Sequence, residues 1–255
     1  MSEPILSAEG VAVQVGGRRV LESVGLNVAA GEFVGLVGPN GAGKTTFLRA
    51  AAGLVPLAAG SIRVEGASLA ELGAAGMARR VAYLPFGAPC HWAMTAERVV
   101  SLGRLPFQPA WQGLSAADWS IIDDAMQRAE ADAFARRSID RLSAGERARV
   151  MVARALAQQP RLLLADEPTA TLDPYHQLRV LEALRGIATG GGAVLAVFHD
   201  LPLAARFCSR LVLMKDGKVS AEGPPDAVLA PDNVLATYGV EMGADRAATY
   251  TLPRS

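Results

Sequence analysis

A glycine-rich segment near the start of the chain restricts the folds that it can adopt. Residues 38–45 have the sequence Gly-Pro-Asn-Gly-Ala-Gly-Lys-Thr, which fits the pattern GxxxxGKT. An apolar run at residues 32–37 precedes this segment, and a helical pattern follows from Lys44 to about Ala52. Glycines let successive backbone N–H groups turn toward one anion, and the start of the helix is positively polarised. Strand, loop and helix together predict an α/β domain that binds a phosphate group.

This phosphate loop is expected to hold ATP with a magnesium ion. Lys44 would contact the β- and γ-phosphates, and the hydroxyl of Thr45 would bind Mg²⁺. A glycine-rich turn without a ligand is the alternative, but the flanking strand and helix favour a nucleotide site. We expect the ATP-binding residues to be Gly38, Pro39, Asn40, Gly41, Ala42, Gly43, Lys44, Thr45 and Thr46.

A second apolar strand ends in two adjacent carboxylates. Residues 161–167 have the sequence Arg-Leu-Leu-Leu-Ala-Asp-Glu, and ligands of α/β sheets bind at the carboxyl ends of parallel strands. We expect Asp166 to belong to the Mg²⁺ shell and Glu167 to polarise the attacking water as the catalytic base. Adjacent acids at a strand end are often only solvated turn residues. The phosphate loop earlier in the chain favours the catalytic interpretation.

Strands and helices alternate along the chain, with one helical interruption. We expect a P-loop NTPase core with a parallel sheet at residues 1–85 and 158–243, an inserted α-helical subdomain at 86–157, and a C-terminal tail at 244–255. The first 37 residues, with short β-rich runs, would add a β-rich subdomain. Helices are predicted at residues 44–52, 95–102, 115–129, 143–157, 174–188 and 201–207, and strands at 32–37, 62–64, 81–84, 161–165, 193–198 and 210–214. The helix at 115–129 would begin with the capping pair Ser115 and Asp118.

Composition excludes several classes of protein. The 25 basic and 25 acidic side chains balance, so no general basic surface is available for nucleic acid. Met1 to Gly10 lack the pattern of a secretory signal, and the longest stretch without charged side chains, Val81 to Ala96, is too short to span a bilayer. The two cysteines and three histidines show no zinc-site spacing.

Two further motifs complete an ordered set. Residues 141–146 are Arg-Leu-Ser-Ala-Gly-Glu, in which Ser143 and Glu146 have the spacing of a helix capping box. Residues 197–200 are Val-Phe-His-Asp. The phosphate loop, LSAGE, LLLADEP and this last segment follow one another in the order of the ATP-binding cassette family. Over nearly its whole length the chain resembles that family, which implies the ABC-type ATPase fold.

The resemblance implies a head-to-tail homodimer with two ATP molecules between the chains. Asp173 matches the loop that crosses the dimer interface, although an Asp before Pro is also an ordinary helix N-cap. His199 matches the histidine that orients the γ-phosphate and water, although a lone histidine at a strand end is more often structural. The signature motif, which would contact ATP held by the other copy, corresponds to Ser143, Ala144, Gly145 and Glu146.

Two shorter segments are similar to ATPases that drive uptake of iron-siderophore, haem and cobalamin. These are Ser-Leu-Gly-Arg-Leu-Pro-Phe at residues 101–107, and Glu-Gly-Pro-Pro-Asp-Ala-Val-Leu at 222–229 with Tyr-Gly-Val at 238–240. The resemblance implies a peripheral subunit on the cytoplasmic face of the inner membrane that couples ATP to import of a metal chelate. Its partners would be a membrane permease dimer and, indirectly, an extracytoplasmic substrate-binding protein, with no nucleic acid.

Three positions differ from the family pattern. Val15 stands where an aromatic side chain usually stacks on adenine, Phe86 where a glutamine follows Tyr-Leu-Pro, and Ala144 where the signature has a second glycine. We expect Phe86 to contact the permease, so that water completes the metal shell. The aromatic and apolar residues after it are expected mostly in the core of the helical insertion: Trp92, Leu105, Phe107 and Trp111.

Two other functions remain open from the sequence. A soluble cassette ATPase of the repair or translation type would act on nucleic acid or the ribosome, but such proteins usually carry two cassettes or long insertions. A small-molecule phosphotransferase with a P-loop would have no use for the LSAGE motif. Salt-sensitive nucleic-acid binding would favour the first alternative, and a phosphorylated acceptor the second.

Overall fold

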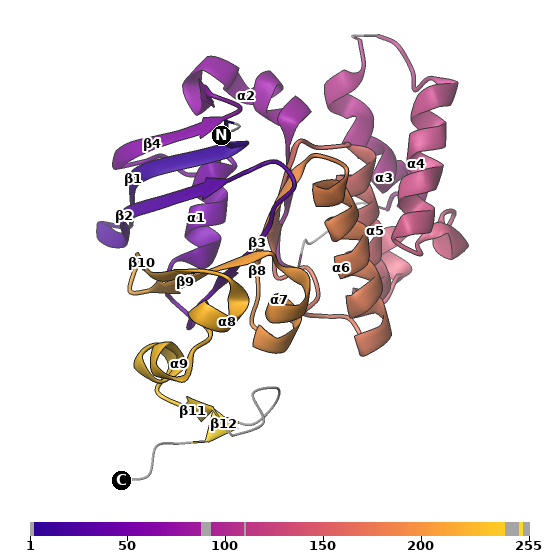
Figure 1. Ribbon diagram of the computed structural model, residues 1–255. Coiled ribbons are helices and arrows are strands. Elements are labelled where there is room, and N and C mark those ends of the chain that lie inside the picture. Colours follow the sequence, from indigo (N-terminus) through magenta and orange to yellow (C-terminus); the bar gives the residue numbers. More distant parts are fainter. Residues whose placement is uncertain (1–2, 88–92, 110, 243–249, 252–255) are drawn as a thin grey trace.

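The computed structural model describes residues 3–87, 93–109, 111–242 and 250–251 (Figure 1). Trp92, which the sequence predicts in the helical insertion, lies outside the described residues. Within the described part of the chain, no helix combines the length and apolar character that a membrane crossing requires.

A six-stranded sheet forms the centre of the molecule. Its order is β10-β9-β3-β8-β7-β6, and all neighbours are parallel except β10, which pairs antiparallel with β9. The predicted parallel sheet is therefore confirmed except at this edge, where the turn at Asp216 and Gly217 folds the chain back as a hairpin. The strands are β3 (Phe33–Val37), β6 (Val81–Leu84), β7 (Leu162–Asp166), β8 (Ala193–Val197), β9 (Arg210–Lys215) and β10 (Lys218–Gly223).

Both faces of this sheet are covered, so its strands are apolar throughout. In β7, Leu162 and Leu164 pack into one core, whereas Leu163 and Ala165 pack into the other. The first core lies between the central sheet and a second, antiparallel sheet, with α1 (Lys44–Ala51) buried between them. This second sheet has the order β2-β1-β4-β5 and consists of β1 (Leu6–Val15), β2 (Arg18–Val28), β4 (Ala59–Val64) and β5 (Ala67–Ser68).

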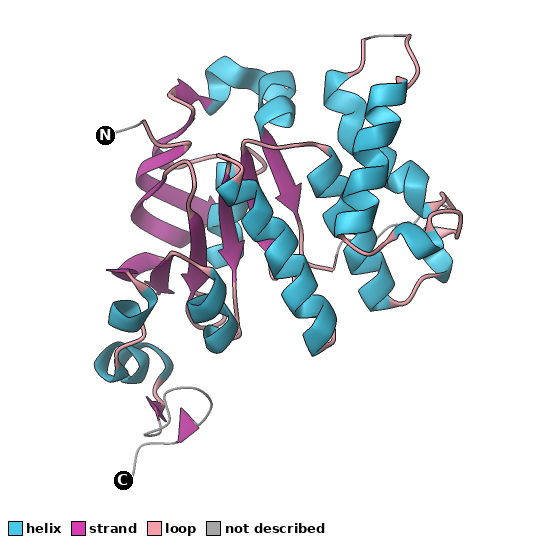
Figure 2. Cartoon of the chain, turned by 45° about the vertical axis from the view of Figure 1, so that its right-hand side comes forward, coloured by secondary structure: helices cyan, strands magenta, loops and turns pink. Residues whose placement is uncertain are grey.

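The other face of the central sheet carries most of the remaining helices (Figure 2). The helical insertion contains α3 (Ala96–Ser101), the 3₁₀ segments η1 (Leu102–Phe107), η2 (Asp132–Phe134) and η3 (Ile139–Arg141), α4 (Ala116–Arg128) and α5 (Ala144–Ala157). Next to it on this face lie α6 (Pro174–Thr189) and α7 (Leu201–Phe207). The capping boxes predicted at Ser115 and Ser143 are both present, which confirms where α4 and α5 begin.

Several elements were not predicted. Helix α2 (Leu69–Arg80) precedes β6. Only Met77 in it is fully buried, and Gly73 at φ 57° interrupts its helical backbone. Its capping box, Ser68 with Glu71, is a sequence pattern from which the start of this helix could have been predicted. At the C-terminus, α8 (Pro225–Val228) and α9 (Pro231–Tyr238) each begin with proline, and β11 (Glu241–Met242) pairs with β12 (Tyr250–Thr251) of the predicted tail.

The expectation that the apolar residues of the insertion lie mostly in its core is wrong for three of them. Leu105 and Phe107 are exposed, and Trp111 is as exposed as a free side chain, at 103%. These residues belong to η1 and to the irregular segment before α4, where no regular periodicity directs side chains inward.

The Gly-Arg pair in η1 instead joins the helices of the insertion. The buried guanidinium of Arg104 donates to the Asp118 carboxylate at 2.9 Å and to the carbonyl of Ala157, the last residue of α5, at 3.1 Å. Gly103 permits this approach, because a Cβ there would lie 2.4 Å from the backbone oxygen of Arg154. The pair therefore sets the distance between η1 and α5.

We predict that Gly103→Ala destabilises the chain by about 1–3 kcal/mol, the usual cost of forcing a methyl group into a packed contact. Gly113→Ala is the control, since a Cβ at Gly113 meets nothing within 4 Å. Urea denaturation of both variants measures the difference. Equal stability of the two would show that the contact between η1 and α5 tolerates a methyl group.

Candidate nucleotide site

The phosphate loop is shaped by two glycines that have no room for a side chain. A Cβ at Gly38 would lie 2.1 Å from the Met214 carbonyl oxygen, and one at Gly43 would lie 2.5 Å from a methyl group of Leu21. Gly43 is also the N-cap of α1, with φ 97° and no side-chain cap. The N–H groups in the first turn of α1 therefore receive no capping side chain and point into the loop.

The predicted phosphate and metal residues lie together, although 121 positions separate Thr45 from Asp166. The Thr45 hydroxyl donates to Asp166 Oδ1 at 3.0 Å. The ammonium group of Lys44 is buried and donates to the carbonyls of Gly38 and Pro39 at 2.6 and 2.9 Å. A hydroxyl, a carboxylate and a buried cation thus meet where the loop approaches the end of β7.

Burial governs the protonation of both charged groups. It lowers the pKa of Lys44, against the attraction of the Glu167 and Asp166 carboxylates. It raises the pKa of Asp166, and Glu167 raises it further, whereas Thr45, Arg49 and Lys44 act in the opposite direction. Each ionised group therefore carries a desolvation cost that a bound polyphosphate and metal would offset.

Glu167 and His199 form a close pair beside the loop. Oε1 of Glu167 lies 2.6 Å from Nε2 of His199, and the two residues follow the neighbouring strands β7 and β8. Glu167 has φ 51°, an unusual conformation for a residue with a side chain, while the preceding Asp166 remains in the strand. The change of backbone direction separates the two carboxylates that are adjacent in sequence.

These residues line one cavity, which we call the loop cavity. It is lined by Val20, Asn40, Gly41, Ala42, Gly43, Lys44, Thr45, Thr46, Glu167 and His199. All except Val20 were predicted as ATP-binding or catalytic residues. Val20 was missed because an isolated valine in a strand carries no chemical signal.

A second cavity, the signature cavity, lies elsewhere on the chain. It brings the start of α5 together with the loop before α6 and is lined by Ser143, Gly145, Glu146, Arg149, Thr171, Leu172, Asp173 and His176. Asp173 is the N-cap of α6 and accepts from the His176 amide at 2.9 Å. The two predicted groups, LSAGE and Asp173, thus share one surface.

Ala144 and Phe86 line a third cavity, next to Arg147, Met151 and Glu167. Ala144 lines this third cavity, whereas its neighbours Ser143 and Gly145 line the signature cavity. Phe86 is 53% exposed and is not a core residue. Val15, at the position expected for a base-stacking aromatic residue, is also exposed.

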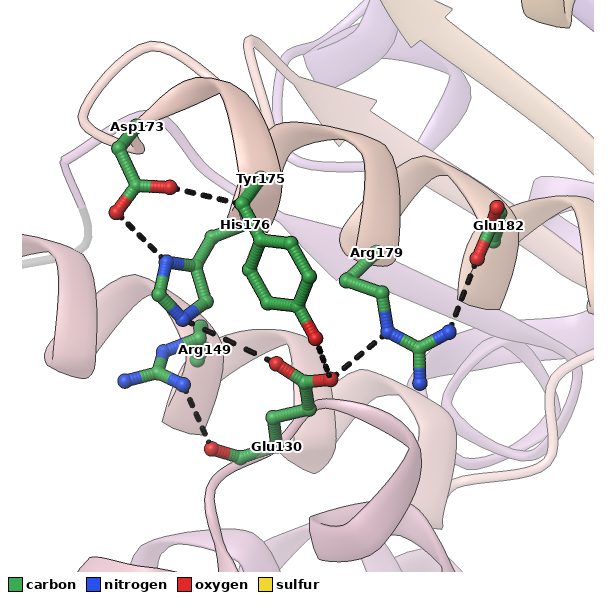
Figure 3. A network of polar contacts seen from close by, with 7 residues as sticks. All are labelled: Glu130, Arg149, Asp173, Tyr175, His176, Arg179 and Glu182. Atoms are coloured by element: carbon green, nitrogen blue, oxygen red, sulfur yellow. Dashed lines mark hydrogen bonds and ion pairs between the residues drawn. The ribbon is translucent and has the colours of Figure 1, made fainter.

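The sequence did not indicate the polar network between α6 and the helical insertion (Figure 3). His176 lies 2.8 Å from Asp173 through Nδ1, and Glu130 accepts from Tyr175 and Arg179. Glu130 precedes these partners by more than forty positions, with no motif to connect them.

A phosphate loop after β3, a carboxylate at the end of β7 and a parallel sheet define the chain as a P-loop NTPase. The sequence profile of the family described as ABC transporter matches residues 21–170. The chain belongs to this family and carries its ATPase domain.

Individual relatives agree with this assignment. The chain is 46% identical to a hemin import ATP-binding protein of Streptomyces coelicolor, over 92% of this chain and 84% of that protein. It is 43% identical to a cobalamin import ATP-binding protein of Halobacterium salinarum, over 95% of this chain but only 61% of that protein's length. A dimeric ATP-binding cassette in a post-hydrolysis state, bound to ADP and Pi, is similar at a TM-score of 0.76 and 27% identity, covering 86% of this chain and 98% of that chain.

We predict that Asp166→Asn raises the free energy of unfolding of the nucleotide-free chain at neutral pH. Because the pKa of Asp166 is raised in the folded state, its ionised form opposes folding above that pKa, and an amide removes this cost. The gain should shrink as the pH falls through the raised pKa, where Asp166 itself takes up a proton.

Urea denaturation at neutral and acidic pH checks this prediction. Asp124→Asn is the matched control, because the Asp124 side chain is 66% exposed. If Asp166→Asn instead lowers the free energy of unfolding at neutral pH, the ionised carboxylate stabilises the fold and the prediction is wrong.

Proposed function

We propose that the chain is the ATP-hydrolysing subunit of an importer, working as a head-to-tail homodimer with a membrane permease. The observation that carries this proposal is the separation of the loop cavity from the signature cavity, which have no lining residue in common. A nucleotide in the loop cavity would therefore meet Ser143 and Gly145 only if a second copy supplied them. The start of α5 then receives an anion, as helix N-termini favour.

The residues at the loop fit an ATP·Mg²⁺ complex. Thr45 and Asp166 supply hydroxyl and carboxylate oxygens, the ligand type that Mg²⁺ prefers, and they already lie 3.0 Å apart. The metal would be held by these two groups with phosphate oxygens and water, and it would supply charge neutralisation on the phosphates. Phe86 offers no oxygen to it.

Glu167 and His199 are proposed to act on the water that attacks the γ-phosphate. Glu167 accepts its proton, since this carboxylate lines the cavity beside the loop. His199, in contact with Glu167 through Nε2, orients the carboxylate and the γ-phosphate. Lys44 releases its two loop carbonyls and contacts the β- and γ-phosphates.

For the cargo we propose a metal chelate, of the haem, cobalamin or iron-siderophore type. The relatives named for hemin and cobalamin import, and the segments at residues 101–107 and 222–229, support this class. The chain would then lie at the cytoplasmic face of the inner membrane, against a permease dimer that receives cargo from an extracytoplasmic binding protein. Balanced surface charge gives no reason to expect a nucleic-acid partner.

We predict that Glu167→Gln lowers ATP hydrolysis by about 10²-fold or more, because the amide keeps the size of the side chain but cannot accept the proton. ATP binding should persist, and a closed dimer should accumulate with ATP. Phosphate release and sedimentation with ATP measure both effects. Lys44→Ala is the contrasting variant, which should weaken ATP binding itself. Turnover of Glu167→Gln near the parent rate would show that another group activates the water.

We predict that Phe86→Ala weakens association with the permease about tenfold or more, because exposed aromatic side chains often dominate interfaces. The isolated subunit should keep its melting temperature, since Phe86 is 53% exposed. Leu54→Ala, which removes another exposed apolar side chain from a different element, is the control. Co-purification and vesicle transport measure the effect. Unfolding of Phe86→Ala with unchanged permease affinity would refute the docking role.

A further inference from the structure

We propose that Glu130 is a positioning residue that holds the start of α5 and the Asp173 loop together as one surface for the partner's nucleotide. This inference rests on the head-to-tail dimer proposed above. Glu130 belongs to the helical insertion, whereas Asp173 and α6 belong to the core. The two halves of the signature cavity therefore come from different segments of the chain, and Glu130 forms hydrogen bonds to both of them.

The side chain of Glu130 contacts three residues at the start of α6 (Figure 3). Its Oε1 accepts from the Tyr175 hydroxyl at 3.0 Å and from Nε of Arg179 at 2.8 Å. Its Oε2 lies 3.9 Å from Nε2 of His176. His176 in turn holds the Asp173 carboxylate through Nδ1 at 2.8 Å. Hydrogen bonds thus join the insertion to Tyr175 and Arg179, and the His176 ring lies between the Glu130 carboxylate and the Asp173 carboxylate that borders the signature cavity.

The backbone of Glu130 makes the connection to α5. Its carbonyl accepts from Nη1 of Arg149 at 2.8 Å, and Arg149 lines the signature cavity. The guanidinium of Arg149 is also stacked over Phe134, 4.9 Å from the ring centre, which restricts its position. One residue thus contacts both elements that form the cavity, α5 through its carbonyl and α6 through its carboxylate.

The backbone conformation of Glu130 is unusual for a glutamate, which indicates that its side chain is kept for the contacts with α6. Glu130 directly follows the C-cap of α4. Its amide donates to the carbonyl of Gln127, and the amide of Ala131 donates to the carbonyl of Met126. These are the two hydrogen bonds of a Schellman motif. The φ of Glu130 is 52°, in the left-handed region where such a position normally has glycine. A glutamate is the less stable choice for this turn, and the contacts with α6 explain its presence.

The negative charge of the Glu130 carboxylate strengthens its contact with Arg179. Burial raises the pKa of Glu130, but hydrogen bonds from Arg179 and Tyr175, with the charge of Arg179, outweigh it and lower the pKa overall. The carboxylate therefore remains ionised at neutral pH and can hold the Arg179 guanidinium by a charge-assisted bond.

The test uses Glu130→Ala and Glu130→Gly in the Glu167→Gln chain with ATP. Glycine suits the left-handed turn, so this second variant keeps the fold while removing the carboxylate. We expect the dissociation constant of the ATP-bound dimer to rise about tenfold in both, because the partner surface is no longer preorganised. ATP affinity of the isolated subunit, measured by titration, should not change.

The matched control is Glu182→Ala. Glu182 also contacts Arg179, through Nη1 at 3.1 Å, but it lies on α6 itself and does not connect the subdomains. We expect its dimer to dissociate as in the parent. Hydrogen exchange of residues 171–176 in the nucleotide-free chain should quicken in the Glu130 variants and not in Glu182→Ala.

The outcomes separate the two proposals. Dimers of the Glu130 variants as tight as that of the Glu167→Gln parent would overturn the positioning role, and so would unchanged exchange in residues 171–176. If the Glu167→Gln parent stays monomeric with ATP, the proposed head-to-tail dimer is wrong. The proposed role of Glu130 toward a partner's nucleotide is then wrong as well.

Discussion

The nucleotide site depends on burying two opposite charges at the carboxyl edge of the central sheet. Lys44 is 6% exposed and Asp166 is 3% exposed, and each would be costly alone. They meet because β3, which leads into the phosphate loop, and β7, which ends in Asp166, both pair in parallel with β8. The order of strands in the sheet, rather than any local contact, therefore creates the site. Thr45 and Glu167 are positioned by the same two strand ends.

Much of this could be predicted from sequence, where the signal is local. The phosphate loop, the LLLADE strand and the capping boxes at Ser115 and Ser143 each lie within about ten residues, and their chemistry follows from spacing. The contacts of Glu130 could not be predicted, because its partners on α6 are distant in sequence and a glutamate in a left-handed turn has no pattern. The exposure of Trp111 was missed because hydrophobicity alone does not say whether an irregular segment faces the core. Helix α2 was missed because Gly73 interrupts its helical backbone and only Met77 in it is fully buried, which leaves a weak apolar periodicity.

The three cavities lie on different parts of the chain, but some residues line more than one of them. Glu167 lines both the loop cavity and the cavity that contains Phe86, so a change at Phe86 has a short route to the carboxylate that we propose activates the water. The start of α5 borders the third cavity, which contains Phe86, through Ala144 and the signature cavity through Ser143. Helix α5 therefore borders both of the cavities other than the loop cavity, so a change of its position would alter both of them. Arg104 attaches the C-terminal end of α5 to η1, and Arg149, near the middle of α5, donates to the carbonyl of Glu130 in the turn after α4.

The helix starts differ in one respect that bears on the ligand. Helices α5, α6 and α7 each begin with a side chain that caps them, Ser143, Asp173 and Asp200, whereas α1 begins with a glycine that cannot. A phosphate group would therefore serve as the missing cap of α1, and the bound nucleotide becomes part of the secondary structure. Lys44, at the start of the same helix, donates to the carbonyls of Gly38 and Pro39 in its own loop. Among these four helices, α1 is therefore the one whose start a phosphate group would cap.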